Sequence, residues 1–154
     1  MPIDLDDADL EFERMSQGID VQAALAYAQH RAAIVGLPMV RMVHLSAVGE
    51  LAGRYADVHF IDIDTIHRRY LRQACTAAGY LHETLLQGST FEDVVEVVDE
   101  GVARIVSAVT PDIRLPFPER MEFLANRVGL AESCAQLVKL ADLAHECQLR
   151  IQGV

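Results

Sequence analysis

No tryptophan occurs in this 154-residue sequence, and aromatic residues make up only 6% of it. No apolar run approaches the length of a transmembrane helix, so no membrane partner is expected. The core must come from aliphatic side chains, which favours packed helices over a β-sandwich. Since 51% of the residues are hydrophobic, we expect a compact globule in which residues 1–154 form one domain.

Basic residues are scarce as well. The chain has 13 Lys and Arg against 23 Asp and Glu, a formal net charge of -10. Neutralising a nucleic-acid backbone requires a basic face, so no nucleic-acid partner is expected. The N-terminus is acidic, the opposite of a signal peptide's basic start, which predicts a cytoplasmic protein. Residues 1–17 are expected to form a short helix or a loose acidic arm.

Cysteine pairing motifs are missing too. Cys75, Cys134 and Cys147 are an odd number and include no CxxC motif. We therefore expect three small buried hydrophobic side chains in a reducing compartment.

Capping residues and apolar spacing predict an all-α protein, a compact bundle of about seven helices. One helix, from a cap at Asp62 or Asp64, should reach about Gly88, and Gly129 should close another. The helix that Gly129 closes covers about 118–128, and the remaining expected helices cover about 21–36, 39–55, 91–98, 99–109 and 131–151.

The only lysine, Lys139, stands three residues before Asp142 on an otherwise apolar helical segment. A carboxylate on such a face is costly to bury unless a metal or a cation pairs with it. His44, His82 and Glu83 are candidate metal partners far upstream. Each also has a plainer explanation: a core histidine bonded to a carbonyl, a solvated glutamate, or a surface Lys139–Asp142 pair. Several such donors meeting only in the folded bundle are typical of an interhelical metal site.

The order of these residues resembles that of the HD-domain metal-dependent phosphohydrolases, especially the guanosine polyphosphate pyrophosphohydrolase (RelA/SpoT-type) branch. The resemblance covers about residues 24–150. Residues 36–44 look like the family's first histidine motif, and residues 78–83 look like its Ala-x-Leu-His-Asp stretch. The most specific match is to the Lys-Leu-Ala-Asp-Arg-Leu-His-Asn signature, at residues 139–142 and at His145.

The resemblance implies an HD-type bundle with a divalent ion, Mn²⁺ being favoured over Fe, Mg or Zn. The implied metal ligands are His44, His82, Glu83 and Asp142. Such an ion would activate water and polarise a phosphoryl group, with Glu83 also catalytic. Lys139 and Arg31 are expected to contact a small phosphorylated ligand, for which a nucleotide is favoured, although Arg31 could equally be a solvated helix arginine.

The sequence departs from the family pattern at three places. Glu83 replaces the metal-binding aspartate, and Glu146 replaces the asparagine after the last histidine. Leu86 and Gln87 replace a Glu-Asp pair that serves proton transfer, and neither can act as an acid or base. Another carboxylate would have to take that role: Glu92, Asp93 or Glu146.

Three hypotheses follow from the sequence. The first is a metal-dependent phosphohydrolase or pyrophosphohydrolase acting on a nucleotide or related metabolite. The second is a degenerate HD domain that binds metal or nucleotide as a regulatory module without catalysis. The third is a helical interaction protein with no site. Acidity and an alanine-rich surface also allow a homodimer.

Overall fold

The computed structural model describes residues 10, 13 and 15–154, so most of the expected acidic arm over 1–17 lies outside the described residues. The described part contains helices and no strands, which confirms the predicted all-α class. Its elements are α2 (Val21–Ile34), α3 (Met39–His59), α4 (Thr65–Leu81), the 3-10 helix η1 (Thr84–Gln87), α5 (Phe91–Val97), α6 (Glu100–Val109), α7 (Phe117–Leu130) and α8 (Ser133–Ile151).

Most predicted helix starts are confirmed, because local side chains fix them. Four side-chain caps accept backbone N–H groups at the first turns of α2, α4, α5 and α6, namely Asp20, Asp64, Thr90 and Asp99. Thr90 and Asp93 complete a reciprocal capping box. The predicted stop at Gly129 is wrong, since α7 continues to Leu130.

The predicted end at Gly88 of the helix capped by Asp62 or Asp64 is also wrong, because α4 ends at Leu81. The Thr84 hydroxyl donates to the Leu81 carbonyl at 2.7 Å, and His82 Nδ1–H donates to the Gly79 carbonyl at 2.6 Å. These side chains bond carbonyl groups near the end of the helix, and so they compete with the backbone hydrogen bonds that would continue it. His82 and the residue after it therefore lie at the junction between α4 and η1.

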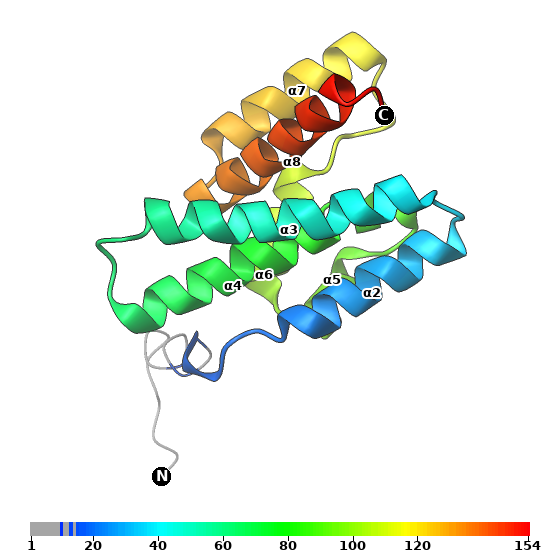
Figure 1. The fold of residues 1–154 in the computed structure, drawn as a ribbon. Helices are drawn as coiled ribbons and strands as arrows, with labels where there is room; N and C mark the ends of the chain where they lie inside the picture. The colour runs from blue at the N-terminus through cyan, green and yellow to red at the C-terminus, as the bar shows by residue number, and fades with distance from the viewer. Residues whose placement is uncertain (1–9, 11–12, 14) are drawn as a thin grey trace.

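Helices α3 and α4 make the most extensive contact in the bundle and run side by side (Figure 1). Two glycines permit this approach: a Cβ on Gly79 would lie 2.6 Å from Gly49 Cα, and a Cβ on Gly49 would lie 2.1 Å from Tyr80 Cδ1. Real Cβ atoms do not approach other atoms so closely. This glycine contact, made by Gly49, Gly79 and Tyr80, fixes α3 against the last two turns of α4.

Helix α8 packs against both α3 and α4 and completes the core around alanine, valine and leucine side chains. All three cysteines are free thiols. Cys75 and Cys134 are buried as predicted, but Cys147 is exposed, so that prediction is wrong for Cys147. No helix among the described residues is long and apolar enough to cross a membrane.

Candidate metal centre

His44 lies on α3, fully buried, and connects two side chains of α8. Its Nε2 is 3.0 Å from Asp142 Oδ1, and its Nδ1 is 2.7 Å from His145 Nδ1. One of the two Nδ1 atoms must donate and the other accept. A neutral His44 that donates Nε2–H to Asp142 accepts from His145 at Nδ1, whereas the other tautomer donates Nδ1–H to His145 and leaves the Nε2 lone pair for a metal, which is how second-shell partners orient metal-binding histidines.

His82 caps the C-terminus of α4 and is 6% exposed. Its Nδ1 is held by the Gly79 carbonyl, as expected for a core histidine. Its buried Nε2, however, has no hydrogen-bond partner. The nearest carboxylate oxygens are Asp142 Oδ1 at 3.5 Å and Glu83 Oε1 at 3.7 Å. A buried polar atom left without a partner is costly, and a neutral Nε2 in that position is suited to ligate a metal.

Asp142 lies on α8, where one oxygen faces the histidines and the other faces a cation. Lys139 Nζ donates to Asp142 Oδ2 at 2.9 Å, while Oδ1 bonds His44. The Asp142 side chain is 15% exposed, so this is not the simple surface pair considered from the sequence. Burial raises its pKa, but the bond from His44, the nearby His82 ring and the charge of Lys139 outweigh burial, so the pKa lies well below its ordinary range.

Two glutamates complete the carboxylate set. Glu83 follows the end of α4, and its Oε1 lies 3.9 Å from His44 Nε2. Glu146 lies one turn after Asp142 on α8, and its Oε1 is 3.5 Å from the same nitrogen. Because α4 ends at Leu81, Glu83 lies outside the helix. Its side chain is one methylene longer than that of an aspartate, and its carboxylate reaches the histidines.

Arg41, one turn before His44 on α3, joins these two glutamates. Its Nη2 donates to Glu83 Oε1 at 2.7 Å and its Nη1 donates to Glu146 Oε1 at 2.6 Å. Burial lowers the pKa of Arg41, but the bonds and charges of Glu146 and Glu83 raise it above its usual value. The guanidinium is therefore a permanent cation at the edge of the cluster.

Together these side chains form two overlapping groups that could hold a metal ion. Ligand atoms of His44, His82 and Glu83 lie within 4.8 Å of one another, as do those of His44, Asp142 and Glu146. Imidazole nitrogens with carboxylate oxygens are donors used for first-row divalent metals. The unpartnered Nε2 of His82 agrees with this use. We call these five residues the ligand cluster.

The histidines differ in proton affinity. Burial lowers the pKa of His82, but Asp142 and Glu83 raise it more, so that its pKa lies above the ordinary value. Burial and the neighbouring charge of His44 lower the pKa of His145. His145 is therefore suited to remain neutral, and it accepts from His44 Nδ1–H only in the tautomer of His44 whose Nε2 is free to ligate a metal.

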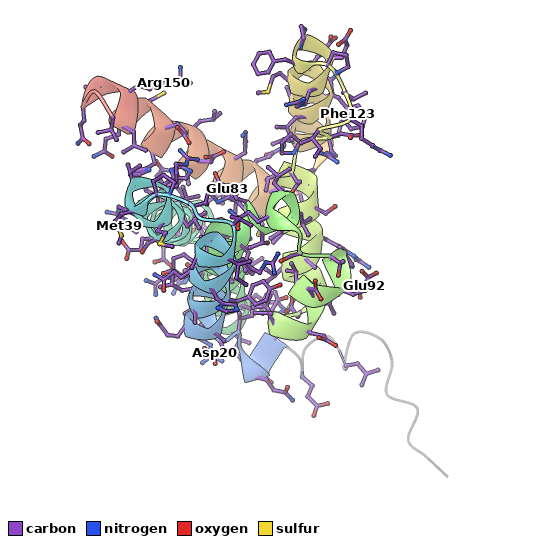
Figure 2. All side chains as sticks on the ribbon, turned by 90° about the vertical axis from the view of Figure 1, so that its right-hand side faces the viewer. Asp20, Met39, Glu83, Glu92, Phe123 and Arg150 are labelled. Atoms are coloured by element: carbon purple, nitrogen blue, oxygen red, sulfur yellow. The ribbon has the colours of Figure 1, made fainter. Side chains whose placement is uncertain are left out.

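The ligand cluster opens into a cleft of about 400 Å³. Helix α8 forms one side of the cleft, with Lys139 and Asp142 at one end and Arg150 at the other. Glu83 and Arg150 are labelled in Figure 2. Apolar groups line the space between: Leu86, Val109, Pro111, Leu143 and Cys147. The cleft therefore combines a polar floor with apolar walls.

The structure brings together the four predicted metal ligands, with Lys139 beside Asp142. Arg31 is elsewhere: its guanidinium donates to the Gln87 carbonyl and does not line the cleft. Of the three proposed replacement carboxylates, only Glu146 belongs to the cluster. Glu92 is exposed on α5, away from the Glu83 label in Figure 2, and Asp93 caps α5.

Sequence reasoning missed Arg41 and gave no orienting role to His145. The available signal was spacing: Arg41 precedes His44 by three residues and Glu146 follows Asp142 by four, so each pair shares a helix face.

Comparisons with protein-family models, curated proteins and solved structures found no significant match for this chain.

Proposed function

We propose that this protein is a small metal-dependent phosphohydrolase that acts on a phosphorylated metabolite of about nucleotide size. The observation that carries the proposal is the buried, unpartnered Nε2 of His82 in a cluster of imidazole and carboxylate groups. This cluster lies at the floor of a cleft, accessible to a small molecule. The resemblance of the motif order to the HD-domain family supports the same reaction class.

The metal ligands in this proposal are His44, His82, Glu83 and Asp142. Two nitrogens with carboxylates favour Mn²⁺ or Fe²⁺ over Mg²⁺, which prefers oxygen ligands. A bound ion supplies Lewis-acid polarisation of a phosphoryl oxygen and a water of lowered pKa.

The chain's own residues then bind and orient the substrate. Lys139, 20% exposed beside Asp142, offers an ammonium to a phosphate oxygen at the floor of the cleft. Leu86, Val109 and Leu143 exclude water from one side of the substrate and pack against its non-phosphate part. Arg150 attracts a second anionic group at the open end.

Proton transfer falls to Glu146 or Glu83 in this proposal, because Leu86 and Gln87 cannot exchange protons. Glu146, with 31% of its side chain exposed, is the more accessible of the two; Glu83 is 19% exposed. Glu146 is therefore the better placed to accept a proton from a water molecule in the cleft and return it to the leaving oxygen.

The test measures phosphate and pyrophosphate release from a panel of nucleotides and sugar phosphates with added Mn²⁺. Turnover by the wild type that is lost in His82→Ala, but kept in the exposed-histidine control His59→Ala, supports the proposal. A folded protein with Mn²⁺ bound and no turnover on any substrate contradicts it and favours the alternative, a regulatory module that binds metal or nucleotide without catalysis.

A further inference from the structure

The most unusual feature of the ligand cluster is that it already contains a cation. The Oε1 atoms of Glu83 and Glu146 approach the histidine nitrogens, and these same two atoms accept hydrogen bonds from Arg41. A guanidinium that bridges two carboxylates through separate nitrogens is among the stronger ion-pair arrangements in proteins.

The charges around the cluster are nearly balanced without any ion. Three carboxylates (Glu83, Asp142 and Glu146) face two side-chain cations, Arg41 and Lys139. With neutral imidazoles, one net negative charge remains. The two cations differ in position, because Lys139 bonds the Asp142 oxygen that points away from the histidines, whereas Arg41 bonds the oxygens that point toward them.

We propose that Arg41 is the resident counter-cation of the ligand cluster, and that it competes with a divalent ion for Glu83 and Glu146. It holds the two glutamates in place in the metal-free protein and lowers the affinity of the site for metal. An arriving ion must share or take the carboxylate oxygens that the guanidinium occupies, against the repulsion of a fixed positive charge. The inference rests on the metal site of the proposed function and does not depend on catalysis.

Partial burial makes this competition stronger than it would be on the surface. The Arg41 side chain is 30% exposed, and those of Glu83 and Glu146 are 19% and 31% exposed. Charges in such surroundings are screened less by solvent and salt than fully exposed ones. Removing Arg41 leaves two neighbouring carboxylates that repel each other, which costs stability until a cation binds between them.

The experiment compares Arg41→Met with wild type by titration with Mn²⁺ alone. Met keeps much of the side-chain volume and removes the charge. We expect Arg41→Met to bind Mn²⁺ at least about tenfold more tightly, a difference of about 1.4 kcal/mol. Its melting temperature in chelator should fall below that of the wild type, and Mn²⁺ should raise it by more than it raises the wild type.

The matched control is Arg54→Met, on the same helix and about three turns from His44. Arg54 makes no ion pair among the described residues, so its removal should leave Mn²⁺ affinity unchanged. A folded Arg41→Met protein whose Mn²⁺ affinity equals or falls below that of the wild type overturns the proposal. A merely structural role for Arg41 would lower the melting temperature with and without Mn²⁺ and would not tighten binding.

If Arg41→Met does not fold, the wild type still provides a test. The ¹⁵N-bound proton signal of Arg41 Nε should shift when diamagnetic Zn²⁺ is added, whereas that of Arg54 should not. Bound Zn²⁺ with an unchanged Arg41 signal contradicts the proposal. If Arg41→Met binds Mn²⁺ more tightly but no turnover is found, only the proposed hydrolase function is contradicted. If turnover is normal but Arg41→Met leaves the Mn²⁺ affinity unchanged, only this inference is contradicted. No metal bound by either protein overturns both.

Discussion

The glycine contact joins α3 and α4, and the ligand cluster beside it joins these helices to α8, yet the two regions are built in opposite ways. At Gly49 and Gly79 the backbones approach so closely that no Cβ fits. At the ligand cluster, polar side chains face one another, and one buried nitrogen, His82 Nε2, has no partner.

The difference shows which region is optimised for stability and which for a ligand. The glycine contact gains close packing between α3 and α4. The ligand cluster instead keeps a desolvated nitrogen and several carboxylates, which reduce stability unless something binds them. The two regions are connected, because the Gly79 carbonyl that lies at the contact also holds the His82 ring through Nδ1.

The largest effect we expect comes from Asp142→Ala, which removes the carboxylate shared by His44 and Lys139. Since loss of a second-shell partner alone weakens metal binding by about 10- to 100-fold, loss of this ligand should weaken Mn²⁺ binding by more than about 100-fold. Titration calorimetry measures the affinity, and circular dichroism should show an intact helical fold. The control is Asp57→Ala, a half-buried carboxylate on α3 that pairs with Arg72. Unfolding of Asp142→Ala at ambient temperature would mean that Asp142 is a structural ion-pair residue.

Gly79→Ala should disrupt the glycine contact between α3 and α4. Its new Cβ would meet the backbone of Gly49, so we expect a loss of about 1–3 kcal/mol in the free energy of unfolding. Denaturant titration measures it. Gly129→Ala is a matched control, since Gly129 is helical and nothing lies within 4 Å of its added Cβ. It should be neutral or stabilising by up to about 1 kcal/mol. Equal effects of the two changes would show that the close contact is not real.

His82→Leu should have a smaller effect, measured in chelator. The change removes the unpartnered Nε2 but also loses the bond from Nδ1–H to Gly79, and each is worth about 1 kcal/mol. We therefore expect the free energy of unfolding to change by less than about 1 kcal/mol. The neighbouring Leu81→Ala, at a fully buried position, should cost about 2–5 kcal/mol. A loss in His82→Leu as large as that in Leu81→Ala would contradict a ligand role and indicate a structural histidine.

The smallest effect concerns Asp64, at the opposite end of α4 from the cluster. The backbone N–H of His67 lowers the pKa of Asp64 below its ordinary value of 3.8. A carboxyl group with a lowered folded-state pKa stabilises the fold above the unfolded value and loses that effect as the pH falls through the folded value.

Asp64→Ala should therefore melt below the wild type at pH 6, with the difference shrinking toward pH 2. The matched control, Asp62→Ala, should show no difference, because Asp64 and not Asp62 accepts the N–H group at the start of α4. The same pH-dependent loss in Asp62→Ala would disprove the assignment of the cap.

The sequence predicted most helix starts because their signals are local. A single side chain such as Asp20 or Thr90 bonds the first turn that follows it. The end of α4 was missed because the apolar helical spacing continues beyond Leu81. The break comes from the side chains of Thr84 and His82, which take carbonyls that the backbone N–H groups of a longer helix would use.

The candidate site was predicted in part. The charge of Asp142 on an apolar helix suggested His44 and His82 as partners, and a family resemblance supported their order, whereas no local pattern requires them to meet. Arg41 was missed because its bond to Glu146 joins residues 105 positions apart in the sequence. Such a pair becomes visible only when α3 and α8 are placed against each other.

The most direct test of the central claim is the number of metal ions that the wild-type chain retains. Protein purified without chelator is dialysed against Mn²⁺, and its metal content is measured by mass spectrometry beside that of His82→Ala. We predict one ion per wild-type chain and a clear loss in His82→Ala. A wild-type protein that retains no ion, or a His82→Ala variant that retains as much as the wild type, would contradict the claim.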